Sequence, residues 1–244
     1  MKYIEKDLES SIIIDAHTRL EASKTYNSDP KVRDHLRTIY HGCCAYCESK
    51  FEEGAYFQID HFYPKGNKQY KPYEKEIRNL HYSCQRCNNL KGDSCKRIMS
   101  PNWFLSGNDW KLTKKDKIER EIYYVGHLLY SNNTQGTIDR GKKTIELFNL
   151  NNANPSPRSN RASLVEGRLR VLNDMYLTLK AMTNLLVNYD YSNNITIEIL
   201  IYQAIIKTRP DAPYSTMIIH NYGDLLVKLL KIYLFKRDGV RIRM

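Results

Sequence analysis

The sequence predicts an α+β fold that is mainly helical, with a small zinc-stapled module between N-terminal and C-terminal helices. Two observations predict it. Two Cys-x-x-Cys pairs have the spacing of a single metal site, and the C-terminal half carries apolar residues at helical intervals. We therefore expect an N-terminal helical segment over residues 1–42, the zinc-stapled module over residues 43–100, and a helical region over residues 101–244.

The N-terminal segment is predicted to end in a helix. Ser28 or Asp29 can cap it, and Pro30 suits the first turn, where a helix leaves backbone N–H groups unused. Gly42 is expected to end it beside the first cysteine pair. The apolar residues that share one face of this helix are Val32, Leu36, Ile39 and Tyr40.

Four cysteines are predicted to hold a structural zinc ion. They are Cys44 and Cys47 in the first pair, and Cys84 and Cys87 in the second. Four thiolates complete a closed tetrahedral site with no open coordination position, so the zinc itself is not expected to take part in chemistry. Cys43 could compete for the metal, but the two-residue spacing favours Cys44, and Cys43 and Cys95 are expected to stay as reduced thiols.

The residues between the two cysteine pairs form the candidate catalytic group. A strand over residues 56–59 is predicted to lead into Asp60 and His61, and a polar loop then leads to a second short strand near Asn79. Asn88 directly follows the last cysteine and is expected to open a helix. The turn that binds sulfur would then also direct the Asn88 side chain.

These residue types suit the hydrolysis of a phosphodiester. A neutral imidazole with a pKa of about 6.5 can take a proton from water at physiological pH, which makes His61 the candidate general base. The Asp60 carboxylate and the Asn88 carbonyl are hard oxygen ligands, which suit Mg²⁺ or Mn²⁺. Lys65 and Lys91 lie beside them in the chain, either to neutralise a substrate phosphate or as solvated surface charges.

The motif residues and their order resemble the HNH (ββα-metal) endonucleases. The resemblance implies that His61 is the general base and that Asn79 shapes the loop between two strands. It also implies that Asn88 and Asp60 are the protein ligands of the catalytic metal. If Asn88 is not a ligand, His81 is the next candidate.

Longer phrases are similar to the HNH subunit of Septu-type and retron-linked anti-phage defence systems. They are residues 44–48, 60–65 and 83–92, with weaker likeness at residues 144–151 and 212–215. Two departures are Asp60 where many members have Glu, and the absence of Phe-Pro after Gly92. The resemblance implies an ATPase partner of the ABC/SMC type and, in retron-linked versions, a reverse transcriptase with its multicopy DNA.

A second class of function fits the same cysteines. Paired Cys-x-x-Cys motifs are typical of zinc ribbons and plain nucleic-acid-binding modules. The alternative to an endonuclease is therefore a catalytically silent, zinc-stapled binding or adaptor subunit. The motifs leave the substrate open between DNA and RNA.

The distribution of charge predicts a polyanionic partner. The net charge is +11; residues 1–40 carry seven basic and seven acidic side chains, and residues 41–244 carry 31 and 20. The whole excess thus falls on the module and the C-terminal region, as expected for nucleic-acid binding, although a basic balance can also serve solubility. Some of the 19 tyrosines are expected to stack on unpaired bases.

The C-terminal region is predicted to hold helices over residues 159–188, 195–207 and 224–236, with linkers over residues 131–136 and 149–159. No signal peptide and no apolar run long enough to span a bilayer is evident, so we expect a cytoplasmic protein. The predicted buried seam of the first of these helices is Val165, Leu169, Leu172, Tyr176, Leu179 and Leu186.

Overall fold

The computed structural model describes residues 1, 4, 6, 9–50, 57–101, 121–132, 139–153 and 161–239. Within these residues the chain is mainly helical and contains two small antiparallel sheets of two strands each. The predicted fold class is therefore confirmed. Among the described helices, none is both long and apolar enough to cross a lipid bilayer.

Two helices form the N-terminal segment. Helix α2, Pro30–Ile39, begins as predicted, since the Asp29 side chain accepts a hydrogen bond from the Lys31 amide at 2.9 Å and Pro30 occupies the first turn. Helix α1, Ser11–Ala22, was not predicted, although Ser10 caps it. The three isoleucines in its first turn form only a short apolar stretch, and packing against α2 is what gives that stretch a buried side.

The cysteine pairs enclose a strand–strand–helix unit. Strand β1, Phe57–His61, pairs antiparallel with β2, Leu80–Cys84, and helix α3, Gln85–Lys91, contacts both strands. Asp60 and His61 are thus the last two residues of β1, whereas a strand ending at residue 59 was predicted. Residue 56 lies outside the described residues. The polar loop between the strands contains two short 3-10 helices, Lys68–Tyr73 and Ile77–Asn79.

A hairpin and a short helix come next, and neither was predicted. Strand β3, Ile122–Val125, pairs with β4, Leu128–Ser131, and helix α5, Arg140–Leu147, contacts β4. Strands of four residues are too short to show a clear alternation of apolar and polar side chains. Of the linkers predicted over residues 131–136 and 149–159, residues 133–136 and 154–159 lie outside the described residues, and Ser131 belongs to β4.

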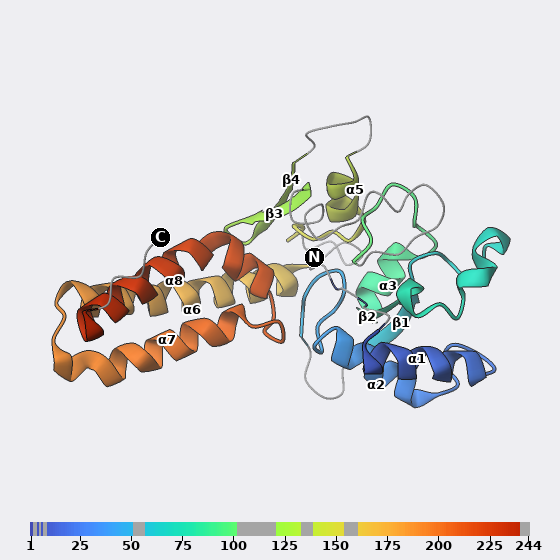
Figure 1. Cartoon of the computed structure of the whole chain (residues 1–244). Helices are drawn as coiled ribbons and strands as arrows, with labels where there is room; N and C mark the ends of the chain where they lie inside the picture. The colour runs from blue at the N-terminus through green and yellow to red at the C-terminus, as the bar shows by residue number, and fades with distance from the viewer. Residues whose placement is uncertain are drawn as a thin grey trace.

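Three long helices form what we call the arm: α6, Ala162–Val187; α7, Asn194–Thr208; and α8, Ser215–Asp238. Figure 1 shows the arm extending to the left, away from α1, α2 and the β1–β2 sheet. All three helices were predicted, but α8 begins earlier than residue 224. The predicted seam of α6 is partly wrong, because Leu169 and Tyr176 are 42% and 48% exposed. The side chains buried on α6 are Leu164, Val165, Arg168, Met175, Thr178, Leu179, Met182 and Leu186.

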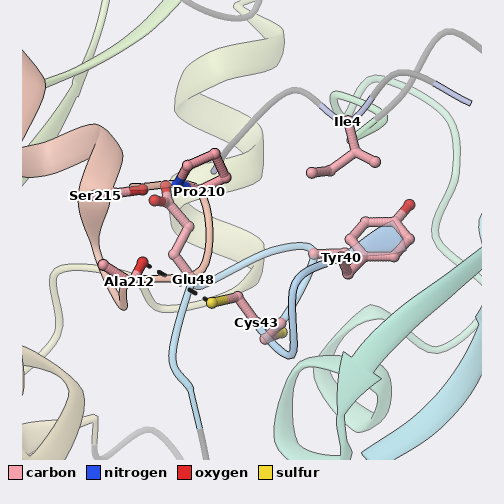
Figure 2. Close-up of a pocket in the computed structure, with 9 residues that line it drawn as sticks. Ile4, Tyr40, Cys43, Glu48, Pro210, Ala212 and Ser215 are labelled. Carbon is pink, nitrogen blue, oxygen red and sulfur yellow. Dashed lines mark hydrogen bonds between the residues drawn. The ribbon is translucent and has the colours of Figure 1, made fainter. Parts of the chain in front are cut away.

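The arm and the cysteine module share one hydrophobic core. Tyr46 of the first cysteine pair stacks on Phe148, with ring centroids 4.4 Å apart, and the core cluster continues from there into α6–α8. Figure 2 shows Glu48 turned toward Pro210 and Ser215 across this junction. The cavity there measures about 10 Å³, room for about one water. The division at residues 42 and 100 stays a prediction.

Candidate functional site

The four predicted zinc ligands meet at one point. The Sγ atoms of the two cysteine pairs are buried and lie within 4.8 Å of one another. Zinc–sulfur bonds of about 2.3 Å put tetrahedral sulfurs about 3.8 Å apart, so a small contraction would close the cluster on one zinc ion. Backbone N–H groups already point at the sulfurs: the Cys84 amide donates to Cys44 Sγ and the Cys87 amide to Cys84 Sγ, each at 3.4 Å.

A buried arginine from outside the module completes this cluster. Arg161 donates from Nη2 to Cys87 Sγ at 3.4 Å. A zinc ion with four thiolates carries two negative charges, and a guanidinium beside the sulfurs offsets part of that charge. Hydrogen bonds from the other three cysteines lower the pKa of the Cys47 thiol well below its usual value. Cys43 stays outside the cluster, and its Sγ faces the Ala212 carbonyl.

Asn79 fastens the loop between the two strands. Its side chain is fully buried; Oδ1 accepts from the Tyr63 amide at 2.8 Å, and Nδ2 donates to the Tyr63 and Tyr73 carbonyls at 3.1 and 3.0 Å. Its own backbone carbonyl accepts from the Phe62 amide at 2.9 Å. Asn79 therefore ties together the chain that leaves β1 and the chain that enters β2, and its loop-shaping role in a catalytic site stays a prediction.

His61 is held by two contacts. Its Nε2–H donates to the Glu74 carbonyl at 2.9 Å, and the edge of its ring meets Tyr26, with ring centroids 4.4 Å apart. A proton on Nε2 leaves the lone pair on Nδ1. Burial lowers the pKa of His61, which favours the neutral imidazole. Lys65 lies nearby, with Nζ 4.4 Å from the centre of the Tyr26 ring.

Asp60 is buried and already has two hydrogen-bond donors. Lys91 Nζ lies 3.2 Å from Oδ1, and the Tyr46 hydroxyl donates to Oδ2. Lys91 is only 1% exposed and also donates to the His61 carbonyl at 2.6 Å. The structure therefore brings Asp60 and Lys91 together beneath the surface. An ionised carboxylate has about four lone-pair sites, so this pairing leaves Asp60 acceptor capacity for a metal ion.

Asn88 lies one turn inside α3, whereas it was predicted to open the helix. Cys84 takes the capping position, so α3 begins at Gln85. The Asn88 Nδ2 donates to Gln58 Oε1 and not to Asp60, and within the described residues Oδ1 has no hydrogen bond. Gln58 and Asp60 lie two residues apart and point to the same side of β1. Oxygen atoms on this side fit the ligand preference of Mg²⁺ or Mn²⁺.

A cleft of about 470 Å³ opens along the edge of β1. We call it the β1-edge cleft. One wall comes from the turn before α2 and from α2 itself, and the other from β1 and α3. Its lining residues are Tyr26, Asn27, Asp29, Pro30, Arg33, Phe57, Gln58, Ile59 and Asn88.

Several site residues were missed at the sequence level. The spacing of Gln58 was a weak indication of its place in the site, since it lies two residues before Asp60 and such residues share one face of a strand. No sequence pattern indicated Tyr26 or Arg161, because only tertiary packing brings them to His61 and Cys87, which are far away in the chain. His81, the alternative metal ligand, is fully buried opposite Asp60 in the strand register, and its Nδ1 shares a hydrogen bond with the Tyr40 hydroxyl. Burial lowers the pKa of His81 well below its usual value, as for a packed core histidine.

Comparison with known proteins agrees with this geometry. Residues 44–94 match the family model described as HNH endonuclease. The Septu protein PtuB of Bacillus thuringiensis is 31% identical over 144 residues, which cover 50% of this chain and 54% of that protein. The chain thus spans about half the length of this curated relative. No solved structure gave a significant match. The predicted resemblance to HNH proteins of Septu type is confirmed.

Proposed function

We propose that this protein is a metal-dependent endonuclease that hydrolyses phosphodiester bonds of DNA or RNA. The observation that carries this proposal is the hydrogen bonding and protonation of the His61 ring. Its Nε2–H is engaged by the Glu74 carbonyl, so Nδ1 is the basic atom, and burial favours the neutral ring. Within the described residues, one ring nitrogen of this buried histidine is fixed and the other has no hydrogen bond, which suits general-base catalysis.

The reaction can be derived from these groups. His61 Nδ1 takes a proton from a water molecule whose oxygen attacks phosphorus. The bond from phosphorus to the departing sugar oxygen breaks, and that oxygen takes up a proton from solvent water. Asp60 and Asn88 would hold a hydrated Mg²⁺ or Mn²⁺, which supplies positive charge for the phosphate and the departing oxygen when it is bound. Asn79 keeps the loop that carries Glu74 in place, because it is bonded on both sides of that loop.

The two lysines take different parts in this proposal. Lys65 lies close to Tyr26, which contacts His61, and is exposed enough to approach a substrate phosphate. Lys91 is buried and bonded to Asp60. We therefore assign Lys91 to positioning the Asp60 carboxylate, and a direct contact with substrate would require that pair to open.

The cellular setting we propose is anti-phage defence in the cytoplasm, together with an ATPase partner. The likeness to a Septu protein supports the setting. The arm supports a protein partner, because α7 carries apolar side chains on both faces and a helix of that kind is normally covered. The outward side chains are Ile195, Ile199, Tyr202 and Ile206, and they are 73%, 52%, 63% and 38% exposed. Retron reverse transcriptase and multicopy DNA remain a further prediction.

A silent binding or adaptor subunit is the second candidate. The observation in its favour is that both carboxylate oxygens of Asp60 already accept hydrogen bonds. Such a protein would keep the zinc cluster and bind nucleic acid without cutting it.

Cleavage by a His61→Ala variant distinguishes the two. With Mg²⁺ or Mn²⁺ and a plasmid or RNA substrate, the variant should cut about a hundred- to ten-thousand-fold more slowly, the usual contribution of a general base. His127→Ala, which changes a partly buried histidine in the β3–β4 turn, is the matched control and should cut normally. Zinc content should be unchanged in both. Cleavage by His61→Ala at the wild-type rate would overturn the assignment.

A further inference from the structure

The β1-edge cleft lies next to the proposed catalytic group but is walled largely by the N-terminal segment. Asn88 lines it from α3, and Tyr26 connects it to His61 through the ring contact at 4.4 Å. Its volume of about 470 Å³ falls in the range of pockets that hold a small ligand, about 300–1,000 Å³. A substrate strand whose phosphate approached Asn88 would extend into this cleft.

Arg33 is the cationic side chain that lines the cleft. It is exposed, and none of the ion pairs among the described residues involves it. Arg37 comes one helical turn later, is also exposed, and lies on the same side of α2. Helix α2, which carries both arginines, contacts β2, so both charges lie near the β1–β2 sheet. Arg33 therefore lines the cleft, and Arg37 lies one turn further along α2, outside the lining residues.

One acidic group, Asp29, also lines the cleft. Its charge is already engaged, because it caps α2 through the Lys31 amide and pairs with Arg19 at 3.1 Å. These bonds lower the pKa of Asp29, with the capping bond as the largest cause of the lowering. Among the residues that line the cleft, the balance of free charge is therefore positive, which suits an anion.

We propose that the β1-edge cleft binds the nucleic-acid strand beside the bond that is cut, and that Arg33 contacts a backbone phosphate there. This inference rests on the proposed nuclease function and adds that the N-terminal segment is part of the substrate site. Phosphate is the shared chemistry of DNA and RNA, so Arg33 contributes to affinity for both. Arg37 is placed to contact the next phosphate along α2.

Binding measured without cleavage tests the proposal. In the full-length, zinc-loaded His61→Ala protein, fluorescence anisotropy monitors a short labelled DNA strand and an RNA strand of the same sequence at several salt concentrations. Adding Arg33→Gln should weaken binding about three- to tenfold and reduce the salt slope by about 0.7, as for one lost phosphate contact. Lys31→Gln removes the same charge from an exposed site on α2 outside the cleft lining and should change neither value.

Cleavage kinetics complete the test. In the wild-type background, Arg33→Gln should raise KM with little change in kcat, as expected for a group that binds substrate and transition state alike. Equal binding by the Arg33→Gln and Lys31→Gln proteins, or no binding of either strand by the His61→Ala protein, would overturn the proposal. Arg33-dependent binding by a protein that cuts neither strand would instead remove the nuclease function and keep the cleft as a binding site.

Discussion

The cysteine module and the arm are stabilised in different ways. In the module, many buried polar atoms have specific partners: Asp60 pairs with Lys91, Asn79 makes three side-chain hydrogen bonds, and four sulfurs share one cluster. Nε2 of His81 is an exception. In the arm, most buried side chains are apolar, and many apolar side chains stay exposed. The apolar residues most exposed on the arm are Val187, Ile195 and Tyr202, and Tyr191, in the connection between α6 and α7, is similarly exposed.

This difference separates two tasks. A buried polar network tolerates few arrangements, because any unpaired group carries a desolvation cost, so it holds a site in one geometry. An apolar surface fixes the geometry of its contacts less strictly than hydrogen bonds do. A large exposed apolar surface marks a site of contact with another protein. The fixed geometry of the module therefore suits the catalytic group that we propose, and the exposed apolar surface of the arm suits the protein contact that we propose.

The largest effect should come from the zinc cluster. Cys84→Ser should release zinc and disorder the module, since structural zinc contributes about 10–16 kcal/mol to small zinc domains. The arm should keep much of its helix, because its core residues on α6–α8 pack mainly on one another. Metal analysis and segment-resolved hydrogen exchange measure both, and Cys43→Ser is the control that should keep zinc. A zinc-free variant with an ordered, active module would contradict the four-cysteine site.

The second effect concerns the catalytic metal. Asn88→Ala should raise the Mg²⁺ concentration needed for half-maximal cleavage about tenfold or more, because a bond to a charged group contributes about 1.5–3 kcal/mol. Mn²⁺ should rescue the variant better than Mg²⁺, and zinc should stay bound. Asn89→Ala, at the exposed neighbouring position, is the control. Full activity with unchanged metal dependence would show that Asn88 contributes only to the structure of α3 and does not bind the catalytic metal.

The third effect concerns the contact between the arm and the cysteine module. Arg161 precedes α6 and donates to Cys87 Sγ. Arg161→Gln should weaken zinc binding about ten- to a hundredfold, as when an outer partner of a metal ligand is lost. Arg170→Gln, an exposed arginine on α6, should leave it unchanged. Competition with a chelator measures the difference, and equal zinc affinity in both variants would mean that the arm does not support the cluster.

The smallest effect on stability should lie on the outer face of α7. Ile199→Asp should shift the free energy of unfolding by no more than about 0.5 kcal/mol, as is usual for an exposed position. The same change should abolish co-purification with the proposed ATPase partner, while Thr196→Asp, exposed but off the apolar face, should not. A large drop in melting temperature for Ile199→Asp would show that this face is already covered within the chain.

Local patterns were enough for much of the fold and the site. Cysteine spacing predicted the four-sulfur cluster that could hold zinc, because two residues between thiols suit one metal ion. Pro30 after a capping residue located the start of α2, and apolar periodicity located the three arm helices. The motif order placed His61 and Asn79 in the sheet unit where their contacts are now seen. Each of these signals lies within a short stretch of chain.

Tertiary structure decided the rest. Only the fold set Tyr26 against His61, Lys91 beneath Asp60, and Arg161 against the zinc sulfurs. It also turned α6 so that Leu169 and Tyr176, predicted to be buried, face outward. Periodicity shows that a helix has an apolar side, but which side is buried depends on what the rest of the chain brings to it. Likewise, whether a charged side chain meets substrate or a buried partner depends on neighbours that are distant in sequence.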